Sequence, residues 1–264
     1  MTVCIAAICD EGKKVVASSD RMITISMPPI EYEHAVPKIE KVFKSCVALT
    51  SGSALEHTEL CREVENRISG MSAPSTRTIV DKIVECYIER RRRKIEEEIL
   101  KSRGFSFDTF YPNLKNLPPE IGITIDSRIE SYNFNLEILA AGVDKIGGHV
   151  YQIDNPGTAS CFDALGYGSV GSGWHHAVYS LIGNNYTCLV PLKEAAYLVY
   201  ESKRRAESAP GVGRDTDMCV ITKDGITTLS EETMRSLNEI YEKKMEIERS
   251  RTKEINELIK NLKL

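Results

Sequence analysis

The 264-residue sequence lacks the paired cysteines that usually hold a structural metal. None of its cysteines belongs to a Cys-x-x-Cys pair, and no histidine follows one at metal-ligand spacing, so a zinc site is not expected. The eight cysteines are isolated, at positions 4, 9, 46, 61, 86, 161, 188 and 219. We therefore expect no metal, no other cofactor, and reduced thiols of the kind found in the cytoplasm.

Long apolar runs and a large excess of one charge are also missing. No segment approaches the roughly 20 apolar residues that a membrane-spanning helix needs, and no charged stretch followed by an apolar one marks a leader. The net charge of −4 gives no electrostatic footprint for nucleic acid, which binds a clustered basic face. We expect a cytoplasmic protein without a membrane or nucleic-acid partner.

One strongly basic run does occur, over residues 90–94, and it is followed at once by the acidic residues 96–98. Opposite charges three or four residues apart are neighbours on a helix surface. The run therefore predicts a solvated helix face with compensating charges.

Size and composition favour one large domain, because a chain of 264 residues that is 42% hydrophobic can bury a full core. The predicted strands lie at 3–9, 15–20, 38–42, 47–52, 136–142, 149–153, 217–222 and 226–229. The predicted helices lie at 53–69, 78–101, from 174 onward, 191–207 and 230–264. Helices segregated from a hairpin-rich sheet fit a layered α/β sandwich better than an alternating βαβ fold.

Two segments stand apart from this pattern. Residues 102–133 show little periodicity but contain four aromatic residues before Pro112, so we interpret them as an inserted loop or lid that packs on another part of the protein. Residues 230–264 place apolar residues at helical spacing between charges. They predict a helical extension that docks on a neighbouring subunit or forms a short coiled coil.

The first half of the chain contains four short motifs in a fixed order. Thr2 opens a strand that ends at the turn residue Gly12, and Val16-Ala17-Ser18-Ser19-Asp20 forms the next strand, with Thr24 soon after. Lys38-Ile39-x-Lys41-Val42 and Ala48-Leu49-Thr50-Ser51-Gly52 follow.

The second half continues the series with Leu139-Ala140-Ala141-Gly142-Val143-Asp144, Tyr151-x-Ile153-Asp154-x-x-Gly157, Val170-Gly171-Ser172-Gly173 and Met218-Cys219-Val220-Ile221-Thr222-Lys223-Asp224-Gly225. Taken together and in order, these motifs resemble the proteasome β subunits and the related bacterial ATP-dependent peptidase, which are N-terminal nucleophile (Ntn) hydrolases. The resemblance covers most of residues 2–101 and 134–229.

The resemblance implies an α/β fold of a particular kind, a four-layer α-β-β-α sandwich of two antiparallel sheets. It would occupy residues 1–229 with the insertion at 102–133, and residues 230–264 would form a C-terminal helical extension. It also implies a self-compartmentalising ring or spiral of identical subunits that cleaves peptides or proteins, with an ATPase unfoldase as a possible partner.

The same resemblance implies a catalytic set centred on Thr2, whose α-amine is freed when Met1 is removed. The Thr2 hydroxyl would attack the peptide carbonyl, because an N-terminal amine that titrates near neutral pH can accept its proton. Lys38 would lower the pKa of the hydroxyl or relay the proton, and Asp20 would keep Lys38 charged and oriented.

Further residues are assigned supporting roles by their place in the motifs. The N–H of Gly52 would be the oxyanion donor, and Ser172 would hydrogen-bond the Thr2 amine. The substrate-binding positions would be Thr24, Thr50 and Ala54. The family has an Asp where this chain has Arg205, so Ser208 is a possible additional support for the amine.

Alternatives remain open at this stage. The chain is either a threonine peptidase, an inactive assembly subunit of the same fold, or an Ntn amidohydrolase that acts on a small amide. Gly166-x-Gly168-x-x-Gly171 matches a dinucleotide-binding fingerprint in form but lacks a βαβ frame. The adjacent His175 and His176 point to different helix faces, which favours ordinary packing over a metal site.

Overall fold

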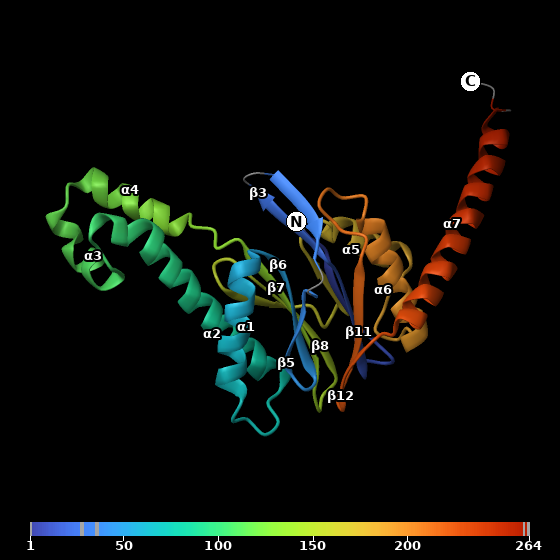
Figure 1. Ribbon diagram of the computed structural model, residues 1–264, viewed down its shortest axis with the longest axis horizontal. Helices are drawn as coiled ribbons and strands as arrows, with labels where there is room; N and C mark the ends of the chain where they lie inside the picture. The colour runs from blue at the N-terminus through green and yellow to red at the C-terminus, as the bar shows by residue number, and fades with distance from the viewer. Residues whose placement is uncertain (1, 27–28, 35–36, 261, 263–264) are drawn as a thin grey trace.

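Two five-stranded antiparallel sheets form the centre of the computed structural model (Figure 1), which describes residues 2–26, 29–34, 37–260 and 262. The side chains of residues 24–26, 29, 54 and 55 lie outside this description. The first sheet has the order β10 (Tyr167–Val170), β1 (Cys4–Cys9), β2 (Lys14–Asp20), β11 (Thr216–Thr222), β12 (Gly225–Thr228). The second has the order β5 (Ile39–Phe43), β6 (Cys46–Gly52), β7 (Leu136–Val143), β8 (Gly148–Asp154), β9 (Thr158–Cys161). A separate hairpin joins β3 (Met22–Ser26) to β4 (Pro29–Glu33).

The two large sheets face each other across an apolar core. Successive side chains of a strand point to opposite faces, so Cys4 and Ala6 of β1 enter this core while Ile5 and Ala7 face away from it. The second sheet contributes mainly alternate residues of β6 and β7 to the same core, including Leu49. Both faces of β1 are therefore buried, which explains why its sequence is an unbroken apolar run.

Helices cover the outer face of each sheet (Figure 1). The helices α5 (Trp174–Gly183) and α6 (Leu192–Ala206) pack on the first sheet. The second sheet is covered by α1 (Ala54–Ile68) and α2 (Thr76–Ile95). The expectation of a mixed α/β chain with antiparallel sheets is thus confirmed.

The C-terminal helix α7 (Glu231–Lys260) lies partly on the body and partly beyond it. Leu237 and Tyr241 are buried against the helices of the first sheet, whereas Ile255 and Leu258 are exposed. Among the described residues, no helix combines the length and apolar character that a membrane span requires.

The segment 102–133 is not a loop, and this part of the prediction was wrong. It forms η2 (Lys101–Arg103), α3 (Phe107–Asn113), η3 (Leu114–Asn116) and α4 (Pro119–Glu130), following the π-helical turn η1 (Glu96–Leu100). With η1 and the end of α2 these elements form a projecting arm (Figure 1). The expected packing of its aromatics is confirmed, because Phe110 is fully buried in a small apolar cluster with Ile95 and Leu100.

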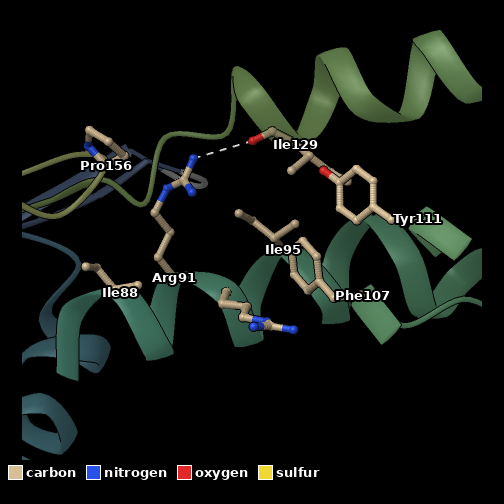
Figure 2. A pocket seen from close by; sticks show the side chains of 8 residues that line it. Ile88, Arg91, Ile95, Phe107, Tyr111, Ile129 and Pro156 are labelled. Atoms are coloured by element: carbon tan, nitrogen blue, oxygen red, sulfur yellow. Dashed lines mark hydrogen bonds between the residues drawn. The ribbon is translucent and has the colours of Figure 1, made fainter. Parts of the chain in front are cut away.

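An open hollow of about 390 Å³ lies where the arm meets the body, shown in Figure 2. Arg91 donates to the Tyr132 carbonyl at 2.9 Å, while Tyr111 lies beside Ile129 of α4 and Phe107 beside Ile95 of α2. The full lining comprises Ile88, Arg91, Arg92, Ile95, Phe107, Tyr111, Ile129 and Pro156. None of these residues belongs to the predicted catalytic set.

The basic run 90–94 is not a uniformly solvated face, which corrects the prediction. The side chain of Arg90 is only 5% exposed and contacts three carboxylates of α1, with its Nη2 atom 2.6 Å from Glu56 Oε2. Arg93, by contrast, is 54% exposed. Both arginines approach Glu63 of α1, but Arg90 also reaches Glu56 and Glu59, and these contacts place it in the interface between the two helices.

We expect Arg90→Leu to lower the free energy of unfolding by about 1.5–3 kcal/mol, because the buried carboxylate of Glu56 loses its charged hydrogen bonds to Arg90 and keeps only Lys94, 3.0 Å away. The side chain of Glu56 is only 11% exposed. Arg93→Leu, in the same run, is the matched control and should change stability by no more than about 0.5 kcal/mol. Urea denaturation followed by circular dichroism measures both. Equal losses in the two variants would contradict a buried role for Arg90.

Candidate active site

The predicted catalytic residues come from segment ends that the two sheets bring together. Strand β1 pairs with β2 on one side and with β10 on the other. Thr2, two residues before β1, therefore lies near Asp20 at the end of β2 and near Ser172 just after β10. Lys38, which precedes β5, arrives from the second sheet.

Thr2, Asp20 and Lys38 form one hydrogen-bonded cluster. The Thr2 hydroxyl donates to Asp20 Oδ1, and Lys38 Nζ donates both to Thr2 Oγ1 and, at 2.9 Å, to Asp20 Oδ1. Thr2 and Asp20 are buried, and the side chain of Lys38 is 14% exposed. An ammonium group this close to a hydroxyl favours loss of the hydroxyl proton.

Backbone N–H groups donate the other hydrogen bonds to the Asp20 carboxylate. Oδ1 accepts the N–H of Val3 at 3.0 Å. Oδ2 accepts the N–H groups of Met22 and Gly213, each at 2.9 Å. A buried carboxylate needs such donors, and here they fix its orientation toward Thr2 and Lys38.

The turn after β10 packs tightly on Thr2. Ser172 Oγ accepts the Thr2 N–H at 3.2 Å, and the Gly173 N–H donates to the Thr2 carbonyl at 3.1 Å. Gly171 has a φ of +93°, and a Cβ at this position would lie 2.4 Å from Thr2 O. Only glycine fits there, both for the backbone angle and for the space.

The remaining predicted residues lie around this cluster without completing it. Gly52 ends β6 with a φ of +106° and is exposed, and Thr50 is buried two residues before it. Their roles as oxyanion donor and substrate contact stay predictions. Thr24 lies in β3 and Ala54 begins α1, but the side chains of both are outside the described part of the structure.

The contacts of Ser208 differ from the predicted one with the Thr2 amine. Its Oγ donates to the Arg205 carbonyl at 2.8 Å and lies 3.3 Å from Nδ1 of His176. The neighbouring His175 stacks on Trp174, with ring centroids 3.6 Å apart. Among the described residues, no group of three or more His, Cys, Asp or Glu side chains is placed to hold a metal ion.

Two residues that shape the site belong to none of the motifs that predicted it. Gly213 reaches Asp20 through its backbone N–H, and Glu137 Oε2 of β7 accepts the Gly171 N–H at 3.0 Å. A backbone donor leaves no trace in residue type, so the glycine pair Gly211 and Gly213 before the last hairpin is the signal that could have pointed to this turn.

Cys4 is a thiol next to the site, but it is not a competing nucleophile. It lies on β1 between the sheets and is fully buried. Burial raises the pKa of the Cys4 thiol above its ordinary value, although the nearby Lys38 lowers it. The thiolate, which is the reactive form, is therefore strongly disfavoured.

We expect Gly171→Ala to destabilise the protein by at least about 2 kcal/mol, since it combines backbone strain of about 1–3 kcal/mol with overpacking of similar size. The matched control is Gly183→Ala at the end of α5, where an added Cβ meets nothing within 4 Å and should be neutral or slightly stabilising. Thermal unfolding of both variants measures the difference. If Gly171→Ala were as stable as the wild type, the close contact with Thr2 would be wrong.

Comparison with known proteins adds no assignment to this geometry. Neither a model of a known protein family nor a curated protein matches the sequence. The resemblance of its motifs to the proteasome β subunits stays a prediction, and the reaction has to be inferred from the residues around Thr2.

Proposed function

We propose that the chain is a proteasome-like threonine peptidase that hydrolyses peptide bonds with Thr2 as its nucleophile. The observation that carries this proposal is the contact of the Thr2 hydroxyl with both Lys38 Nζ and Asp20 Oδ1 inside a buried cluster. A free hydroxyl is a weak nucleophile, and activation by adjacent charged groups is what a hydrolase of this type requires.

The base in this proposal is the α-amine of Thr2 itself, exposed by removal of Met1. An α-amine titrates at about pH 7.7–8.0, so a substantial fraction is unprotonated at neutral pH. Ser172 Oγ lies 3.2 Å from the Thr2 nitrogen and would orient that amine. Lys38 would stabilise the negative charge that develops on Thr2 Oγ1.

The reaction then proceeds in two steps, acylation of Thr2 and hydrolysis of the resulting ester. A bond forms between Thr2 Oγ1 and the substrate carbonyl carbon as the hydroxyl proton passes to the α-amine, and the N–H of Gly52 would bind the oxyanion. The carbon–nitrogen bond breaks and the leaving amine takes that proton. Water next attacks the Thr2 ester, which releases the carboxylic acid and restores the hydroxyl.

The packing of the elements supports the finer fold assignment as well. Two antiparallel sheets that face each other, with helices over both outer faces, are what a four-layer Ntn-hydrolase sandwich requires. In this proposal identical subunits assemble into a ring or spiral that encloses the sites. The projecting arm and the exposed half of α7 are candidates for subunit contacts or for gating. An ATPase unfoldase is a candidate partner that would supply substrate.

The first test is the intact mass of the protein with and without a threonine-directed epoxyketone. We expect loss of the Met1 mass and one covalent adduct, which Thr2→Ala abolishes, because the reagent requires a free N-terminal threonine. Retained Met1 without an adduct would contradict the peptidase and leave an inactive assembly subunit. Turnover of a small amide but not of peptides would favour the amidohydrolase.

The second test compares two lysines of neighbouring position. Lys38→Ala should lower peptide turnover by about 10²–10⁴-fold, the usual contribution of a positioned proton-transfer group. Lys41→Ala is the matched control, because Lys41 lies on β5 but is exposed, and turnover should stay within about twofold. Similar activity in both variants would remove Lys38 from the mechanism.

A further inference from the structure

A fully buried lysine, Lys203, lies behind the candidate site. It belongs to α6, its side chain is 0% exposed, and α6 packs directly on β2. Its Nζ donates to Glu207 Oε1 at 2.8 Å and to the Arg214 carbonyl at 2.7 Å. Burying an ammonium group costs several kcal/mol unless it is paired. Packing alone therefore does not explain a lysine at this position.

The hydrogen bonds of Lys203 lead to Asp20. The residue before Arg214 is Gly213, whose N–H donates to Asp20 Oδ2 at 2.9 Å. Lys203 therefore holds, through the Arg214 carbonyl, the same turn whose Gly213 N–H donates to the catalytic carboxylate of Asp20.

The other charged groups around Lys203 support the same turn. On α6, Glu207 also contacts Arg204, whose Nε lies 3.2 Å from Glu207 Oε1. From β4, Glu33 Oε1 accepts the Asp215 N–H at 2.8 Å and the Arg214 N–H. The turn 213–215 is thus held at a carbonyl by Lys203 and at its amides by Glu33.

We propose that Lys203 is a positioning residue of the Thr2 site, which holds the turn at the Arg214 carbonyl so that the Gly213 N–H stays against the Asp20 carboxylate. As a role in catalysis this rests on the proposed peptidase function, but the placement of the turn does not. Burial lowers the pKa of Lys203, and the carboxylate of Glu207 opposes that effect, so Glu207 helps to keep Lys203 charged.

The test compares Lys203→Met and Lys203→Gln with the wild type. Methionine removes both the charge and the donor, whereas glutamine keeps a donor for the Arg214 carbonyl and removes the charge alone. Lys193→Met is the matched control, because Lys193 lies on the same helix but is exposed. The first readout is the hydrogen-exchange rate of the Gly213 amide, followed by NMR, with the amides of β1 and β2 as the reference for global stability.

We expect the Gly213 amide to exchange about tenfold faster in Lys203→Met than in the wild type, because the turn loses the charged donor that holds the Arg214 carbonyl. Lys203→Gln, which keeps a donor, should show a smaller increase, and Lys193→Met should show none. A purely structural role would speed the exchange of the β1 and β2 amides as much as that of Gly213, and that outcome would overturn the proposal. If Lys203→Met does not fold, the exchange of Gly213 relative to the strand amides in Lys203→Gln decides by the same criterion.

The second readout is the rate of epoxyketone addition to Thr2 at neutral pH. In Lys203→Met we expect a rate about 10–100-fold below that of the wild type, as small misplacements of catalytic groups cause. An unchanged rate would overturn the positioning role. No addition in the wild type would instead contradict the proposed function, while the exchange of the Gly213 amide would still decide whether Lys203 holds the turn.

Discussion

The burial of one carboxylate, that of Asp20, organises the centre of this molecule. A charge without contact with water must be paired and hydrogen-bonded on all sides. The partners of Asp20 come from segments far apart in sequence: Lys38 before the second sheet, the amide of Val3 on β1, and the turn at Gly213 before β11. The hydrogen bonds and the ion pair that this carboxylate requires hold both sheets, the N-terminal strand and the last hairpin in one arrangement. They also place Thr2.

The parts of the fold that sequence reasoning anticipated are those in which neighbouring residues decide the structure. The apolar run of β1 and the turn at Gly12 announce a hairpin by themselves, and the motif order brought Thr2, Asp20, Lys38 and Ser172 together as the structure does. The helices of the arm were not predicted because they are short. They depend on a capping box at Ser106 and a proline at the start of α4 rather than on a long periodic pattern.

Other features could not be predicted because they depend on contacts between distant segments. Arg90 and Arg93 are the same residue type three positions apart and both approach carboxylates of α1, yet only the first is buried among them. The same holds for Gly213, which acts through its backbone, and for Lys203, a residue type that is normally exposed. Local sequence specifies which residues are available to a site. Tertiary packing decides which backbone groups and buried charges complete it.

The arm and α7 project from opposite ends of the molecule (Figure 1), and this gives the subunit an unusually extended outline for its mass. An extended particle diffuses and sediments more slowly than a sphere of equal mass, so it elutes early from a sizing column. Elution volume alone would therefore overstate the number of subunits in any assembly. Light scattering or native mass spectrometry, which report mass independently of shape, are the appropriate measures of its stoichiometry.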